Sequence, residues 1–98
     1  MPNTRSVFIV DLHYIVPLSN VDAHVPGHVE FLNRSYDAGL FLMSGAKVPR
    51  TGGMIVAISE SRAALDEHLA KDPFHAKNIA EYTITEFQAK MHKTGIFD

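Results

Sequence analysis

The sequence contains no cysteine, and this single absence removes several kinds of chemistry together. Disulfide bonds, thiolate nucleophiles and cysteine-ligated zinc sites are all excluded. A chain without cysteine is compatible with a reducing compartment, and we expect this protein to be cytoplasmic.

The chain also lacks an excess of charge of either sign. Its 9 Lys and Arg and 11 Asp and Glu are dispersed, for a formal net charge of -2. Nucleic acids and anionic lipid surfaces are bound by clustered basic side chains, so we expect neither as a partner. The first apolar run, from Val7, is broken at Asp11 and is too short for a signal peptide or a membrane span. A small neutral or anionic molecule is the expected ligand.

No internal repeat or low-complexity segment interrupts the sequence. Its 98 residues, of which 46% are hydrophobic, are close to the commonest domain size and suffice for one core. We therefore predict a single domain over residues 1–98, with a mostly polar, extended tail over residues 88–98.

Hydrophobic periodicity predicts four strands and two helices. Alternating apolar positions indicate a strand over residues 7–16. A helix is expected over residues 25–38, with Pro26 in its first turn and Gly39 just after its end. The remaining elements are strands over residues 40–44, 54–58 and 80–87 and a helix capped by Ser59 over residues 59–71.

The order strand, helix, strand, strand, helix, strand is that of the ferredoxin-like α+β fold. It places both helices on one face of an antiparallel sheet and leaves the other face open. Val7, Ile9 and Ile15 would lie on that open face, where apolar side chains are unfavourable in water. Pairing of two sheets in a homodimer, a dimeric α+β barrel, is the expected remedy.

His28 lies on the apolar stripe of the first predicted helix, where a leucine would be ordinary. The other residues of this stripe are Val25, Val29, Leu32 and Tyr36, with Phe31 widening it. Asp72 follows the second helix, which this topology places beside the first. A carboxylate that accepts from one imidazole nitrogen fixes the tautomer, so the other nitrogen can transfer a proton near neutral pH. A structural hydrogen bond is the alternative, because buried polar groups usually just find a partner. Asp72 alone could also bond nearby backbone amides in a turn.

A metal site is a weaker interpretation. His24 and His28 have the i, i+4 spacing that can place two imidazoles on one ion, and Asp72 and His75 could add ligands. The Pro26-Gly27 pair lies between the two histidines and would disturb their helical geometry. We expect no metal and no cofactor.

Two other short motifs fail their tests. Ser44 is not a nucleophile elbow, because Leu42 stands where that motif needs its first glycine. Gly52-Gly53 is not a phosphate loop, because no Lys-Ser/Thr follows, and it indicates a hairpin turn. Arg50 nearby could contact an anionic substrate, although a solvated loop arginine is more usual.

An ordered set of short segments resembles the YCII-related (YciI-like) family over nearly the whole chain. None of these segments is specific alone, but their order and spacing are. The matching segments are His28 to Leu32, Asp37-Ala38-Gly39-Leu40, Ser44-Gly45, Gly52-Gly53, Asp72-Pro73-Phe74 and Tyr82 to Phe87.

The resemblance implies a dimeric α+β barrel with a paired histidine and aspartate, here His28 and Asp72, in a cleft between helices and sheet. Some members are associated with removing HCl from a chlorinated hydroxyquinol, and related barrels include muconolactone isomerases. By analogy, His28 would abstract a phenolic or carbon-bound proton and Asp72 would stabilise the imidazolium. The expected substrate-binding residues are Ser44, Arg50, Pro73 and Phe74.

Two departures from the family pattern are expected to reshape the mouth of the cleft. Ala46-Lys47 stands where many relatives have a proline, and Lys77-Asn78 replaces a small-residue turn. The sequence thus favours a metal-independent acid–base enzyme acting on a small aromatic-derived molecule. The alternative is a non-catalytic ligand-binding or accessory dimer in which the His-Asp pair only joins the two helices.

Overall fold

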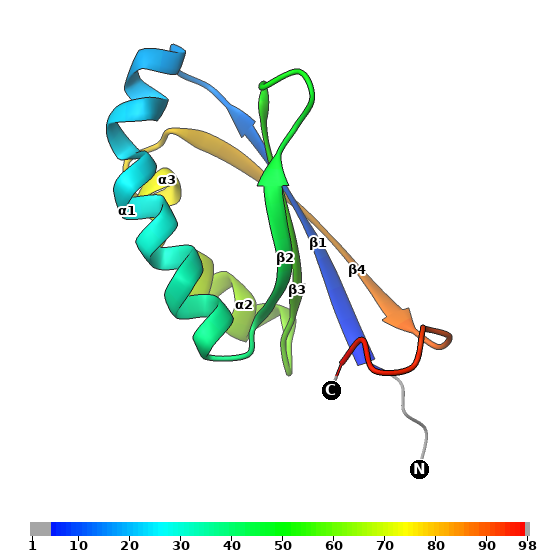
Figure 1. The fold of residues 1–98 in the computed structure, drawn as a ribbon. Helices are drawn as coiled ribbons and strands as arrows, with labels where there is room; N and C mark the ends of the chain where they lie inside the picture. The colour runs from blue at the N-terminus through cyan, green and yellow to red at the C-terminus, as the bar shows by residue number, and fades with distance from the viewer. Residues whose placement is uncertain (1–4, 98) are drawn as a thin grey trace.

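Residues 5–97, which the computed structural model describes, form four strands and three helices (Figure 1). The strands make one antiparallel sheet in the order β2-β3-β1-β4, and the helices cover one of its faces. This confirms the predicted ferredoxin-like α+β fold. The elements are β1 (Arg5–Tyr14), α1 (Leu18–Asp37), β2 (Phe41–Ala46), β3 (Gly52–Ile58), α2 (Arg62–Leu69), α3 (Pro73–Ala76) and β4 (Ala80–Ala89).

Alternate side chains of β1 form the centre of the hydrophobic core. Phe8, Val10 and Leu12 face the helices and are at most 1% exposed. Val10 pairs with Ile55 of β3 and Ile84 of β4, so β1 is flanked by a strand on each side. The helices close this layer with buried side chains: Val21 and Phe31 from α1, Leu65 and Leu69 from α2, and Phe74 from α3.

Helix α1 begins well before the predicted start at residue 25. It starts at Leu18, and the fully buried Val21 gives its first turn an apolar anchor in the core. Pro26 therefore lies inside the helix, where its nitrogen has no hydrogen to donate to the carbonyl of Asp22. Both residues are exposed, so solvent can replace the lost bond. Within residues 5–97, no helix, α1 included, is long and apolar enough to cross a membrane.

The predicted inward stripe of α1 is only partly right. Phe31 is buried, but Val29 and Tyr36 are 44% and 36% exposed. Their place is taken by Ser35, which is fully buried. Its hydroxyl donates to the Phe31 carbonyl at 2.8 Å and accepts from Nε2 of His68 at 2.7 Å. A serine whose hydroxyl is fully hydrogen-bonded can occupy the core, and a hydropathy pattern does not reveal such a buried position.

Helix α2 is shorter than its predicted range of residues 59–71. Its cap is Ser61 rather than Ser59, because the Ser61 hydroxyl accepts the Ala64 N–H at 3.0 Å. The helix ends at Leu69, and the chain then turns into the short helix α3. Asp72 occupies the N-cap of α3, with Pro73 in its first turn.

Gly52 and Gly53 belong to β3 and not to the predicted hairpin turn. A Cβ on Gly52 would lie 1.8 Å from the carbonyl oxygen of Leu12, so only glycine fits beside β1 at this point. The turn itself lies just before, where Lys47 N–H donates to the Gly52 carbonyl at 2.9 Å. Strands β2 and β4 each continue two residues beyond their predicted ends.

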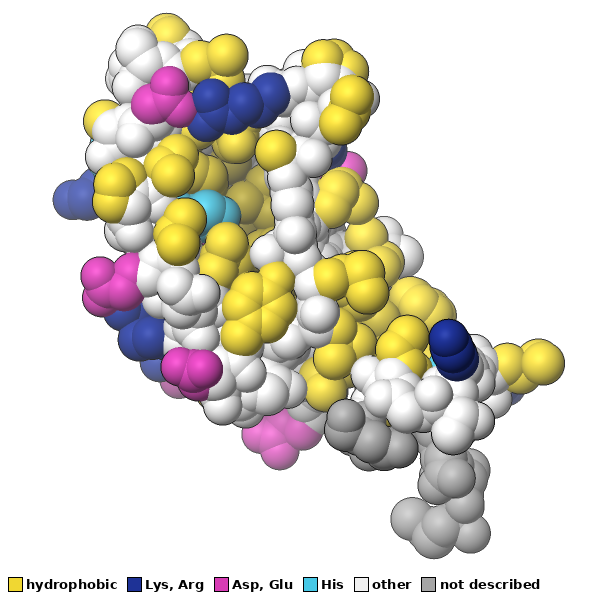
Figure 2. Space-filling model, viewed as in Figure 1, with side chains coloured by type: hydrophobic (Ala, Val, Ile, Leu, Met, Phe, Trp, Pro, Cys, Tyr) yellow, Lys and Arg dark blue, Asp and Glu magenta, His cyan; other side chains and the backbone are white. Residues whose placement is uncertain are grey.

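The sheet face turned away from the helices carries an apolar patch at one end, beside polar side chains such as Asp11, His13 and Thr83. Because strand side chains alternate, Ile9 and its partner Val56 lie on this face, as do Val7 and its partners Ile58 and Phe87. Phe87 is 47% exposed. Figure 2 shows hydrophobic side chains along the strand side of the molecule.

Candidate functional site

His28 and Asp72, 44 positions apart, meet between α1 and α3. The imidazole Nδ1 donates to the two carboxylate oxygens, at 2.8 Å to Oδ1 and 3.0 Å to Oδ2. Asp72 is fully buried and the His28 side chain is 15% exposed. An ionised carboxylate is only an acceptor, so Nδ1 carries the hydrogen and Nε2 of the neutral ring carries the lone pair.

Asp72 is held by two further donors. Its Oδ1 accepts the Phe74 N–H at 2.9 Å, and its Oδ2 accepts the Tyr82 hydroxyl at 2.6 Å. Asp72 therefore bonds His28 and also caps the turn that begins α3, while the catalytic role of the pair stays a prediction. Burial, together with the negative charge and hydrogen bond of Asp72, raises the pKa of Tyr82, so its hydroxyl stays protonated and remains a donor.

The two residues that follow Asp72 also contact α1. The Phe74 ring stacks on the His28 imidazole, with centroids 4.0 Å apart and planes 4° from parallel. Pro73 packs against Gly27, where an added Cβ would lie 3.2 Å from its Cγ. One face of the imidazole is covered by Phe74, which leaves the ring edge with Nε2 for a ligand.

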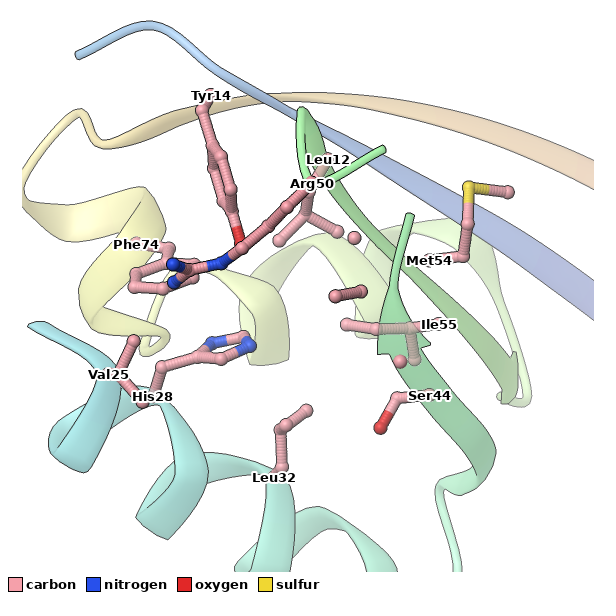
Figure 3. Close-up of a pocket in the computed structure, with 13 residues that line it drawn as sticks. Leu12, Tyr14, Val25, His28, Leu32, Ser44, Arg50, Met54, Ile55 and Phe74 are labelled. Carbon is pink, nitrogen blue, oxygen red and sulfur yellow. The ribbon is translucent and has the colours of Figure 1, made fainter. Parts of the chain in front are cut away.

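His28 opens into a pocket of about 200 Å³ between α1, α3 and the adjacent strands (Figure 3). Its Nε2 has no hydrogen-bond partner among residues 5–97. Figure 2 shows a hollow in the surface on the α1 side, with hydrophobic side chains around it. An apolar cavity of roughly 150 Å³ holds benzene, so this pocket suits a single ring. It is lined by Leu12, Tyr14, Val25, His28, Leu32, Ser44, Gly45, Ala46, Arg50, Gly53, Met54, Ile55 and Phe74.

Three of the four predicted substrate-binding residues line this pocket, namely Ser44, Arg50 and Phe74. The fourth, Pro73, is not among its lining residues and supports α3 against α1 instead. The Ser44 hydroxyl forms a 2.5 Å hydrogen bond with the Tyr36 hydroxyl.

The sequence patterns do not indicate Tyr82 as a partner of Asp72, although the structure shows this contact. In the structure Tyr82 pairs with Leu12 of β1, so its side chain lies on the sheet face turned toward the helices, and the sequence alone does not reveal this pairing. Tyr14 of β1 also lines the pocket, and the alternation of its strand does not by itself indicate a contact with a ligand.

The other histidines near the site serve local roles. His24 lies on α1 together with His28, so the expectation that the helix begins after His24 is wrong. The Nδ1 of His24 bonds the Asn20 carbonyl of its own helix at 2.9 Å. His68 donates to the buried Ser35, and burial, aided by the charges of Lys71 and Arg34, lowers the pKa of His68. Within the described residues 5–97, no three His, Asp or Glu side chains cluster as metal ligands.

The Tyr82 hydrogen bond can be tested by removing one oxygen. Tyr82→Phe should lower the free energy of unfolding by about 1.5–3 kcal/mol, the usual range for a hydrogen bond to a charged group. Urea denaturation measures this loss. Tyr36→Phe is the matched control, because the hydroxyl of Tyr36 bonds Ser44 of β2 at an exposed position. This substitution should change the free energy of unfolding by less than about 0.5 kcal/mol. Equal effects of the two substitutions would show that the Asp72 contact is unimportant.

Comparisons with known proteins agree with this architecture. A sequence model described as the YCII-related domain matches residues 7–88. No curated protein sequence matches the chain significantly. Among solved structures, the chain is similar to 5-chloro-2-hydroxyhydroquinone dehydrochlorinase from Burkholderia phenoliruptrix AC1100, in complex with 2,5-dihydroxybenzoquinone. The TM-score is 0.73 over 83% of this chain and 92% of that chain, and at 13% identity the likeness concerns the fold alone.

Proposed function

The chain belongs to the YCII-related family, and from this premise we propose that it is a small acid–base enzyme that moves protons on a single-ring substrate. Family and fold indicate a small enzyme or a binding module. One observation favours the enzyme. A buried carboxylate holds Nδ1 of His28, while Nε2, which has no partner among the described residues, opens into a pocket of ring size.

The proposed roles follow from this geometry. Nε2 of His28 accepts a proton from the substrate and later returns it. Asp72 stabilises the imidazolium formed in between and keeps the ring in the tautomer whose Nε2 is free. Most of the side chains that line the pocket are apolar, so a bound ring would displace water from it and strengthen this charge interaction.

The most concrete reaction is elimination of HCl from a chlorinated hydroxyquinol, and the fold of the dehydrochlorinase supports it by analogy. Nε2 takes a phenolic proton while the O–H electron pair forms a ring carbonyl, and the carbon that bears chlorine gains a proton. A second phenolic proton then leaves as the C–Cl bond breaks with its electron pair. The products are a quinone, chloride and one proton, so no external oxidant is needed.

Turnover of hydroxylated and chlorinated quinols is the direct test. The protein is incubated with a panel of these compounds, and chloride release and quinone absorbance are measured against buffer alone. We expect release above the buffer rate for at least one chlorinated member. If every compound of the panel releases chloride no faster than in buffer alone, the proposed dehydrochlorination is wrong.

A ligand-binding module is the second candidate, and one observation favours it. Asp72 caps α3 and bonds Tyr82 as well as His28, so the pair also has a structural role. Saturable binding of panel compounds without any chemical change would support this candidate over the enzyme.

We also propose that a second copy of the chain covers the apolar sheet face. Phe87→Asp introduces a charge on that face and should weaken dimerisation by about 10-fold or more. Val48→Asp is the matched control, because Val48 is 99% exposed in the β2–β3 loop. Sedimentation equilibrium measures both dissociation constants. A wild-type protein that sediments as a monomer at all concentrations would contradict the proposal.

A further inference from the structure

An ion pair joins the two sides of the pocket mouth. Arg50 in the loop between β2 and β3 donates from a terminal guanidinium nitrogen to Oδ1 of Asp22 on α1, at 2.6 Å. Figure 2 shows a basic and an acidic group beside each other at the rim of a hollow in the surface. The guanidinium carbon also lies 6.0 Å from the centroid of the Tyr14 ring, inside the mouth.

The charges around this mouth are unbalanced. Arg50 lines the pocket, and no Asp, Glu or Lys is among the lining residues described by the structure. Asp22 lies outside that lining and reaches Arg50 from the rim. The side chains of Arg50 and Asp22 are 40% and 59% exposed, and exposed pairs of this kind are weakly held.

We propose that the pocket selects a ring bearing one anionic oxygen group, which takes the place of Asp22 on Arg50. A carboxylate or an ionised ring hydroxyl offers the same anionic oxygen, and the guanidinium fork binds such groups well. Asp22 then acts as an internal competitor that lowers affinity for every anionic ligand. This inference deepens the proposed function, because it names the substrate class for the His28 pocket.

Arg50 and His28 would contact opposite ends of the substrate. Arg50 and His28 line the same pocket, and Figure 3 shows the guanidinium above the imidazole. A ring held by its anionic group at Arg50 would therefore extend inward, toward Nε2 of His28. Arg50 would set which rings enter, and His28 would act on the end that lies deeper.

Binding of two matched probes tests the inference without relying on turnover. The probes are para-hydroxybenzoate and para-hydroxybenzamide, which differ in charge and hardly in shape. Calorimetry on the wild-type protein should show the benzoate bound at least about 10-fold more tightly, as expected for a charge-assisted hydrogen bond. Arg50→Met should abolish this difference. Asp22→Asn should strengthen benzoate binding by about 2–5-fold and leave the benzamide unchanged.

Matched controls separate a local effect from a change in net charge. Arg62 and Asp66 form another half-exposed ion pair, on α2, and neither lines the pocket. Arg62→Met and Asp66→Asn should alter neither probe's affinity. Equal strengthening by Asp66→Asn and Asp22→Asn would overturn the proposal. So would equal affinities of the two probes in the wild type, or failure of the benzoate to bind at millimolar concentration.

A substitution of His28 keeps this inference distinct from the proposed function. His28→Asn should preserve the preference for benzoate, because Arg50 is unchanged. If the preference is found and no quinol is turned over, the enzyme proposal fails and the ligand class stands. If quinols are turned over but the preference is missing, the ligand class fails alone.

Discussion

His28→Asn should reduce turnover of any substrate by about 10²–10⁴-fold, the usual contribution of a positioned acid–base group. The asparagine amide nitrogen can occupy the place of Nδ1, so the hydrogen bond to Asp72 is retained while Nε2 is lost. The fold should therefore survive. Initial rates of chloride release or quinone formation measure the loss, and thermal unfolding followed by circular dichroism measures the stability.

His24→Asn is the control for this result. His24 lies one turn earlier on α1 and bonds its own helix backbone, so its substitution should leave turnover within about two-fold of wild type, since surface changes of this kind are nearly neutral. A large drop in melting temperature for His28→Asn, with unchanged turnover per folded molecule, would assign His28 a purely structural role.

Asp72→Ala should cause the largest loss of stability. The carboxylate accepts from His28, Phe74 and Tyr82 at a fully buried position, and its removal leaves all of these donors without their acceptor. We expect the free energy of unfolding to fall by about 3–5 kcal/mol, against a total of about 5–15 kcal/mol for a typical domain. For a chain of this length the melting temperature should drop by about 15–30 °C.

Asp72→Asn distinguishes lost charge from lost hydrogen bonds. Asparagine keeps the shape and one acceptor oxygen, so its loss of stability should be smaller than that of Asp72→Ala, whereas turnover should fall in both variants. Asp66→Ala, which breaks an exposed pair with Arg62, should stay within about 0.5 kcal/mol of wild type in urea denaturation. An Asp72→Ala variant as stable as Asp66→Ala would contradict the structural importance of these contacts.

The meeting of His28 with Asp72 could be predicted because it depends on topology. In a ferredoxin-like fold both helices cover the same sheet face, so a residue after the second helix comes close to the first. The strand pattern of Phe8, Val10 and Leu12 was equally informative, since a period of two is hard to produce in a helix. The role of the pair remains a prediction.

The start of α1 and the contacts of Tyr82 could not be read in the same way. Pro26 is usually a sign of a helix beginning, and only the burial of Val21 in the folded chain shows that the helix has already begun. The Tyr82 hydroxyl finds Asp72 through tertiary packing, and sequence spacing carries no information about the distance between their atoms. The pairing of Arg50 with Asp22 across the pocket mouth is of the same kind.

The consecutive residues Asp72, Pro73 and Phe74 meet the consecutive residues Gly27 and His28 at one crossing of a turn over a helix. The orientation and stacking of the imidazole therefore depend on two short segments, and Tyr82 of β4 ties them to the sheet through Asp72. A shift of α3 along α1 would move the carboxylate, the stacked ring and the proline together, so these contacts are kept or lost as a set.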